Sequence, residues 1–276
     1  MDRLTVRRAE PGDMGSIAAI SRSTWDGEDY LEEAAPGWML GEGFHVGVLD
    51  GKVIGTFRIT EMPDGVLWLE GLRVHPSLQG RGLGRNLSDA AWRLGKQAIG
   101  EGRASRMEFS TYFLNVESIH LALSRGFRQV CGFLCLGLQD IPCRNGVDPI
   151  DPSDRLFTGF RGHIPVGWKA VLSSLEGIQW LHGNARFGRF RGATMLRAAS
   201  SAMYTPLAGS EQAPDDFLNG VEADASAGGD NSLQIVLRPD MTGIRDAALK
   251  KGYTSWDPVE DVNMVVYRWE QGSVQV

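Results

Sequence analysis

The chain has 276 residues, of which 42% are hydrophobic and 22% charged, values near those of globular proteins that exclude an intrinsically disordered chain. This length exceeds the needs of one small domain, and we expect two modest domains. A formal net charge of -6 argues against a protein that follows nucleic-acid phosphates, because such proteins carry a basic excess, and favours a small-molecule or cationic substrate.

The cysteines and the N-terminus add further exclusions. Cys131, Cys135 and Cys143 have a spacing that matches no common zinc or redox motif, so we interpret them as reduced packing residues and predict no metal. The first residues lack the apolar run of a signal peptide, and no stretch reaches the roughly 18 apolar residues of a membrane span. We therefore expect a cytoplasmic protein with no membrane partner.

Strand and helix patterns alternate along the first half. Asp13 is a candidate N-cap for a helix after a first strand at 4–7, and residues 25–38 predict a short helix in a mobile loop. Asp50-Gly51 is a strong hairpin signal between two strands. The other predicted elements are strands at 45–49, 52–60, 66–74, 107–111 and 130–138, and helices at 82–100 and 115–125.

The second half has a fainter pattern. Residues 140–154 are predicted as a linker, and residues 209–232, rich in Gly, Ala, Ser and Asp, as a flexible insertion. Segments 107–127 and 233–253 share one order of strand, helix, glycine and aromatic residue. Either the second half is a decayed copy of the first, or two ordinary β-α-β segments are similar by chance.

A glycine-rich turn between the strand at 66–74 and the next helix carries the clearest chemistry. Such a turn directs backbone N–H groups and the positive end of the helix dipole at one place, which favours an anion, above all a phosphate. The Gly-Lys-Ser/Thr ending of a Walker loop is missing, and Arg85 replaces the third glycine of a dinucleotide fingerprint. The pattern that fits is Q-x-x-G-x-G, from Gln79 through Gly82 to Gly84.

This pattern resembles the pyrophosphate-binding motif of the GNAT superfamily of N-acetyltransferases. The L-x-V-x-P run of Leu72, Val74 and Pro76 and the helix from Asn115 to Gly126-Phe127 also resemble that family, over about residues 3–139. The resemblance implies an α/β fold with a mixed (α+β) sheet, the acyl-CoA N-acyltransferase fold, with acetyl-CoA as cosubstrate and no metal. Together with the linker and the repeated element order described above, it leads us to predict three parts: a GNAT acetyltransferase domain at 1–139, a linker at 140–154 and a GNAT-like domain without a CoA site at 155–276.

The resemblance further assigns contacts with the cosubstrate. The backbone N–H groups of residues 81–85 would hold the CoA pyrophosphate, the Val74 backbone would contact pantetheine and the acetyl group, and Asn115 would touch the pantetheine arm. The side chains of Arg81 and Arg85 either contact phosphates or are solvated. The implied cofactor-binding set is Leu72, Val74, Gln79, Gly80, Arg81, Gly82, Leu83, Gly84, Arg85 and Asn115.

Acetyl transfer needs an amine that has lost its proton. Glu70 shares strand parity with Leu72 and Val74, so we expect it on their face and predict it as the general base, acting directly or through water. Two alternatives stay open: Glu70 pairs with an arginine such as Arg73 or Arg58, or it binds the substrate ammonium.

The family's usual general acid is absent. Many members have a tyrosine seven residues after the helix asparagine, where this chain has Ala122. Because a thiol has a reference pKa near 8.5, CoA can leave as a thiolate without that acid. Tyr112, Ser118 and Ser124 are candidate substitutes, and we expect His75 and His120 to lie at the surface or behind the site.

The aromatic and acidic loop at 25–38 corresponds to the segment that shapes the acceptor pocket in the superfamily. We predict Trp25, Tyr30 and Trp38 as substrate-binding walls, with Asp26, Glu28 or Asp29 attracting a cation. Core packing of the aromatic rings and solvation of the acids is the alternative. Asp29-Tyr30-Leu31 and residues 68–74 also look similar to histidine N-acetyltransferase-like proteins, which carry a degenerate second GNAT half.

In the second half, residues 189–194 stand where a repeat would have its own pyrophosphate loop, and Thr194 replaces a glycine there. We expect this half to be a lid or a dimerisation module, which leaves a homodimer open. The predicted function is acetyl transfer from acetyl-CoA to a primary amine of a small molecule such as an amino acid. The alternatives are a protein N-terminal or lysine acetyltransferase and a non-catalytic acyl-CoA-binding regulator.

Overall fold

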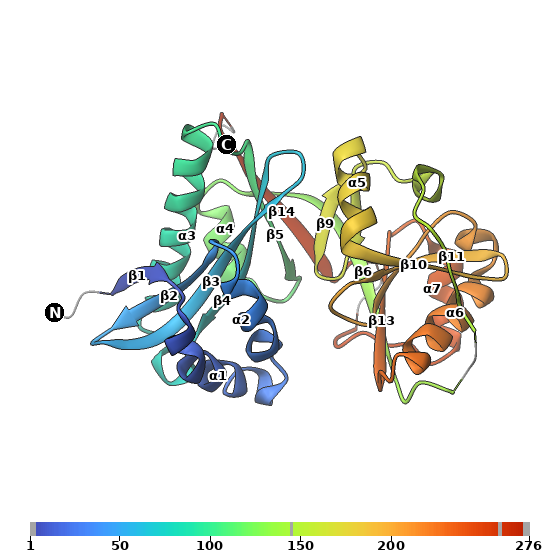
Figure 1. Cartoon of the computed structure of the whole chain (residues 1–276), viewed down its shortest axis with the longest axis horizontal. Helices are drawn as coiled ribbons and strands as arrows, with labels where there is room; N and C mark the ends of the chain where they lie inside the picture. Colours follow the sequence, from blue (N-terminus) through green and yellow to red (C-terminus); the bar gives the residue numbers. More distant parts are fainter. Residues whose placement is uncertain (1–3, 144–145, 259–260, 273–276) are drawn as a thin grey trace. The chain divides into compact units, whose positions relative to one another are not determined.

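The computed structural model describes residues 4–143, 146–258 and 261–272, and they divide into two compact units (Figure 1). Unit 1 holds the described residues of Met1–Phe109, His120–Arg128 and Arg268–Val276, and unit 2 those of Ser110–Ile119 and Gln129–Tyr267. The units interleave along the chain, so no single boundary separates them. The predicted division at 139 and 154 therefore stays a prediction of where each half of the sequence begins.

The sheet of unit 1 is mixed, as predicted. Four strands are consecutive antiparallel neighbours, and the last of them pairs in parallel with β5. Asp50 and Gly51 form the predicted hairpin turn with φ angles of 52° and 74°. The strands are β1 (Thr5–Arg8), β2 (Phe44–Leu49), β3 (Lys52–Met62), β4 (Val66–Val74) and β5 (Arg106–Tyr112).

Helices cover both faces of this sheet. On one face, α1 (Met14–Arg22) and α2 (Leu31–Met39) bury Ile17, Ile20, Leu31 and Ala35 against Phe44 and Val46 of β2. On the other face, α3 (Leu83–Gly100) buries Leu83, Leu87 and Ala91 against Phe57 and Val74. The apolar spacing of α3 is the one the sequence predicted for 82–100.

A β-bulge in β4 decides which face each of its side chains reaches. Arg58 pairs with Glu70 and Thr56 with Arg73, so three steps along β4 correspond to two along β3. Gly71 takes up the extra residue with a φ of 65°. Glu70 and Arg73 therefore lie on the α1/α2 face with Arg58, whereas Val74 packs against α3. The predicted shared face of Glu70, Leu72 and Val74 is wrong, because the bulge reverses the alternation between them.

Unit 2 repeats the element order of the first half. Its antiparallel strands β10, β11 and β12 are followed by α6, by β13 parallel to β12, and by α7 and β14. This order matches β2-β3-β4-α3-β5-α4-β6 and supports the interpretation of a second copy. The bounds are β10 (Ala185–Phe190), β11 (Ala193–Ala198), β12 (Met203–Pro206), α6 (Pro214–Ala227), β13 (Ser232–Leu237), α7 (Thr242–Lys250), β14 (Met264–Glu270), α4 (Val116–Leu123) and β6 (Arg128–Gln139).

The structure corrects one prediction about the connecting segments. Residues 209–232 are no flexible insertion, because they contain α6, whose Phe217, Leu218 and Val221 are fully buried. The predicted linker holds a short strand and begins a 3-10 helix, while residues 144–145 lie outside the described ones. The remaining short elements are β7 (Asp148–Pro149), β8 (His163–Val166), β9 (Lys169–Leu172) and α5 (Leu175–Asn184).

Candidate active site

The glycine turn that precedes α3 leaves a cluster of backbone donors. Gly82 is the N-cap of the helix with a φ of 75°. The Asn86 N–H donates to the Gly82 carbonyl at 3.1 Å, so the amides before Asn86 belong to the first turn, where a helix has no internal partner for them. An anion at this helix start would receive several N–H bonds and the positive end of the dipole.

The space in front of these donors is open. A Cβ placed on Gly82 would meet no atom within 4 Å, and the same holds for Gly80. Arg81 and Arg85, which precede and follow Gly82 in the sequence, are exposed. A turn with open space and with amides that have no partner inside the helix fits a pyrophosphate such as that of CoA, and the exposed Arg81 and Arg85 add positive charge to this segment.

The approach to the turn is held by local hydrogen bonds. The Gln79 side-chain amide donates to the Val74 carbonyl at 3.3 Å, which ties the turn to the end of β4. His75 Nδ1 accepts from the Ser77 N–H at 3.3 Å and caps the short 3-10 helix Pro76–Leu78. His75 therefore has a structural role at the start of this 3-10 helix, and its place relative to the chemistry stays a prediction.

Glu70, the predicted base, lies at the bulge with a side chain that is 11% exposed. Thr60 Oγ1 donates a hydrogen bond to Glu70 Oε1, and the Arg58 guanidinium lies 3.6 Å from the same oxygen. The arginine pairing left open by the sequence is thus present, with Arg58 as the partner. The role of Glu70 as base stays a prediction.

Trp38 organises the surface beside Glu70. Its ring lies 4.8 Å from the Arg58 guanidinium carbon and packs edge-on against Phe44 at 5.2 Å. A Cβ at Gly71 would come within 2.6 Å of the same ring, so the bulge glycine makes room for it. Burial lowers the pKa of Arg58, although a guanidinium remains charged at neutral pH.

Asp29 and Arg73 form a bidentate pair on the same face. Arg73 Nε and Nη2 donate to Asp29 Oδ2 and Oδ1 at 3.1 and 2.9 Å, and the Asp29 side chain is fully buried. Trp25 and Tyr30 lie 4.2 and 5.5 Å from the Arg73 guanidinium carbon. The expectation that Asp29 attracts a cationic substrate is therefore wrong, because the protein's own arginine occupies its carboxylate. The substrate contacts of Trp25, Tyr30 and Trp38 stay predictions.

The comparisons with known proteins identify the family of this part of the chain and the fold of the whole. Residues 16–127 match the model of the acetyltransferase (GNAT) family. The chain therefore carries a GNAT acetyltransferase domain. No curated protein matches the chain.

Solved structures share the fold over nearly the whole chain. A candidate acetyltransferase from Thermoplasma acidophilum has a TM-score of 0.67 at 18% identity, covering 96% of this chain and 99% of its own. A GCN5-related N-acetyltransferase from Sphaerobacter thermophilus has a TM-score of 0.64 at 14% identity, covering 98% and 96%. At these identities the likeness concerns the fold, including that of the second half.

The GNAT helix α4 contains the position of the missing acid. Ala122 is 4% exposed, so this position is enclosed by protein. Tyr112 donates to Asp257 at 2.8 Å, and burial together with that carboxylate raises the pKa of Tyr112 to about 12. A phenol that holds its proton so strongly is a poor acid toward a thiolate. Ser124 donates to the Leu121 carbonyl at 2.8 Å, so the structure gives neither residue the geometry of a free acid.

Asn115 serves the same helix. Its Oδ1 accepts from the Ser118 backbone N–H at 3.3 Å, so Asn115 caps the start of α4. The predicted contact of Asn115 with pantetheine stays a prediction. No group of three or more possible metal ligands occurs among the residues that the structure describes, and none of the described helices is long and apolar enough to cross a membrane.

Sequence reasoning missed two residues of the site. Thr60 was not predicted as a partner of Glu70, and Thr56, which donates to the Gly71 carbonyl at 2.8 Å, was not predicted to anchor the bulge. Thr56, Arg58 and Thr60 occupy every second position of β3 and so share one face of the strand. These polar residues in a largely apolar strand were the sequence signal that could have identified them.

In the second half, residues 189–194 do not form a loop before a helix. They form the β10–β11 hairpin, so the explanation built on Thr194 as a lost glycine is wrong. Thr194 Oγ1 instead donates to the Ala208 carbonyl at 2.5 Å, as Thr56 does to Gly71. The segment that corresponds to the bulge of β4 is therefore the one after β12.

That segment is covered by the chain itself. The Ala208 N–H donates to the Leu156 carbonyl at 3.0 Å, and Arg238, just after β13, donates to the Gly159 carbonyl at 3.0 Å. Arg238 also pairs with Glu211 and Asp240, both at 2.9 Å. Residues 154–160 thus accept hydrogen bonds from one backbone N–H after β12 and from the Arg238 side chain.

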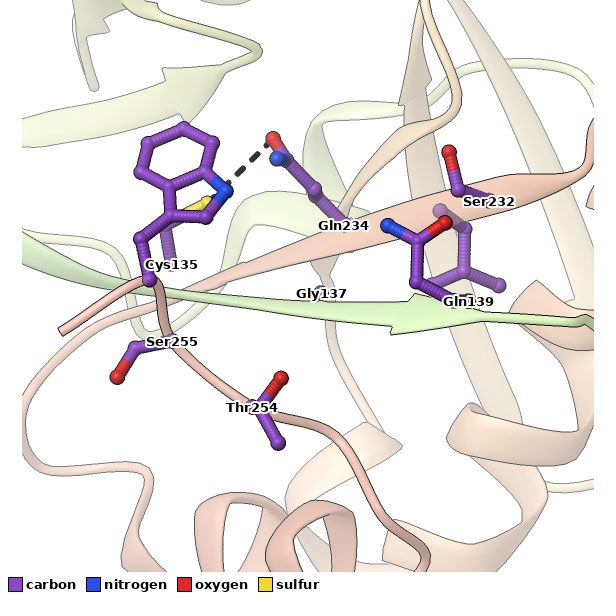
Figure 2. A pocket seen from close by; sticks show the side chains of 9 residues that line it. Cys135, Gly137, Gln139, Ser232, Gln234, Thr254 and Ser255 are labelled. Carbon is purple, nitrogen blue, oxygen red and sulfur yellow. Dashed lines mark hydrogen bonds between the residues drawn. The ribbon is translucent and has the colours of Figure 1, made fainter. Parts of the chain in front are cut away.

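A cavity of about 80 Å³ in unit 2 lies between β6, β13 and residues 254–256 (Figure 2). Its Cys135 thiol donates to Gln234 at 3.6 Å, and burial raises the pKa of Cys135 to about 12. The thiol is therefore protonated at neutral pH, which suits a packing residue better than a nucleophile.

Proposed function

We propose that the protein is an acetyl-CoA-dependent N-acetyltransferase acting on a primary amine of a small molecule. The observation that carries the proposal is the open glycine turn with unused amides at Gly82, next to the strand that holds Glu70 at its bulge. Anion binding and an acid–base group on neighbouring parts of one strand and turn are what acetyl transfer to an amine requires.

Each group of this chain would have one task in the reaction. The backbone amides of residues 82–85 would hold the pyrophosphate, and bound acetyl-CoA would supply an acyl thioester. Glu70 would take the proton of the substrate ammonium, directly or through water. The new bond joins the amine nitrogen to the acetyl carbon as the carbon–sulfur bond breaks, and the sulfur leaves as a thiolate because Ala122 supplies no acid.

We also propose that the second half binds no CoA. Support comes from the segment 154–160, which takes the Ala208 N–H and the Arg238 guanidinium. A cavity of about 420 Å³ remains beside Arg238, but Glu211 and Asp240 neutralise that cation. A phosphate would have to displace two carboxylates there.

Exchange of Glu70 for Gln tests the catalytic assignment. Glu70→Gln keeps the shape and removes the base, so kcat/KM should fall at neutral pH and recover in part at high pH, where free amine is abundant. A loss of equal size at every pH would show that Glu70 binds the ammonium instead. CoA affinity, measured by calorimetry, should stay unchanged and serves as the control.

A non-catalytic acyl-CoA-binding regulator is the second candidate. Two observations favour it. The enclosed Ala122 stands in the position of the usual general acid, and Arg58 pairs with Glu70, the predicted base. Tight CoA binding without turnover, against a panel of amines that includes peptides, would establish this function and contradict our proposal.

A further inference from the structure

Arg58 and Glu70 form a pair of opposite charges on the α1/α2 face. They are direct cross-strand neighbours of β3 and β4, yet their nearest charged atoms are 3.6 Å apart, longer than a hydrogen bond. Their side chains are 21% and 11% exposed, so part of each side chain is in contact with solvent.

Arg58 is held in a fixed orientation. Its guanidinium lies over the Trp38 ring at 4.8 Å, and Trp38 itself is fixed by Phe44 and by the bulge at Gly71. A stacked guanidinium keeps its planar fork of donors available at the edge, which matches a carboxylate.

The other arginine of this face is already used. Arg73 donates two hydrogen bonds to the buried Asp29 and a third, at 3.0 Å, to the Leu72 carbonyl, and Trp25 lies against it. Tyr30 is neutral at physiological pH, since a phenol has a reference pKa near 10. Arg58 and Glu70, in contrast, are paired at 3.6 Å and keep part of their side chains exposed.

We propose that the acceptor is an amine that carries a carboxylate close to its amino group, as an α-amino acid does, and that Arg58 is the residue that recognises it. The carboxylate accepts hydrogen bonds from Arg58 while the ammonium faces Glu70, so one zwitterion replaces the long internal pair with two close contacts. This inference rests on the proposed function of the same site.

The test compares three acceptors with one side chain: a free α-amino acid, its carboxamide and the amine without the carboxyl group. For the wild-type chain, kcat/KM should be about 10- to 100-fold higher for the acid, the value of a charge-assisted hydrogen-bonding group. Arg58→Gln should remove that preference, so that its kcat/KM values for the acid and the carboxamide lie within about threefold of each other; the ratio of the two is the readout, because loss of Arg58 beside Glu70 can change the rate with every acceptor. Arg58→Lys, which keeps the charge but loses the fork, should restore part of the preference.

Arg103→Gln is the matched control, because Arg103 pairs with Glu101 in an exposed turn away from this face. It should leave the acid-to-amide ratio unchanged. Equal rates for acid and carboxamide in the wild-type chain, or an unchanged ratio in Arg58→Gln, would overturn the inference and leave the acetyltransferase proposal intact. No turnover of any amine would refute the proposed function instead, and the two failures are therefore distinguishable.

Discussion

Gly82 offers the sharpest test of the phosphate site, because the chain supplies a control with the same backbone strain. Gly82 and Gly102 have φ angles of 75° and 76°, flank the same helix α3, and have no atom within 4 Å of an added Cβ. Valine at either position costs at least about 1–2 kcal/mol of stability, since an L-residue pays that in the left-handed region.

The two substitutions differ in what the new side chain meets when CoA is present. At Gly82 the valine methyl groups fill the space in front of the helix amides, and displacing two charge-assisted bonds of about 1.5–3 kcal/mol each predicts at least 100-fold weaker CoA binding. Gly102→Val should bind CoA normally. Urea denaturation measures the stability loss, and calorimetry measures the affinity. Equal CoA affinities in the two variants would refute the assignment of the turn.

Two further predictions concern the chemistry. Ala122→Tyr should raise the rate less than tenfold, because a thiolate of reference pKa near 8.5 leaves without an acid. The variant should also lower the melting temperature, since Ala122 is 4% exposed and a phenol overpacks that position. α-Amino groups of pKa near 7.7–8.0 should be acetylated in preference to lysine side chains and polyamines near 10.4, because the neutral fraction at pH 7 differs by about 300-fold. A hundredfold rate gain from the tyrosine, or a preference for polyamines in an acetylation assay at pH 7, would show that another step limits the rate.

Local signals in the sequence were sufficient for much of unit 1. Asp50-Gly51 requires two positive φ angles and forms the turn that its composition predicts. The spacing of Leu83, Leu87 and Ala91 predicts the buried face of α3, and Gln79 to Gly84 predicts where the amides are exposed. Each of these features depends on residues that are close together in the chain.

Features that depend on register and on distant partners could not be predicted. Strict alternation of side chains along β4 predicted that Glu70 and Val74 lie on the same face of the sheet. Only Gly71, between Glu70 and Leu72, indicated a bulge. The pairing of Asp29 with Arg73 joins residues 44 positions apart, and no local pattern specifies it. The prediction for segment 209–232 is wrong because small residues on a buried helix have the composition of a linker.

Both halves of the chain contain a threonine that donates a hydrogen bond to a backbone carbonyl near the end of a strand, but the segments that follow differ. Thr56 fixes the Gly71 carbonyl in one half, and Thr194 fixes the Ala208 carbonyl in the other. The halves differ in the segment beyond this anchor: the first half has an open turn at Gly82, and the second has a backbone donor already used by Leu156. A polar group buried against its own chain has no hydrogen bond left to offer a ligand. The proposed absence of a CoA site in the second half therefore needs no change in the strands, only a neighbouring segment that supplies a carbonyl first.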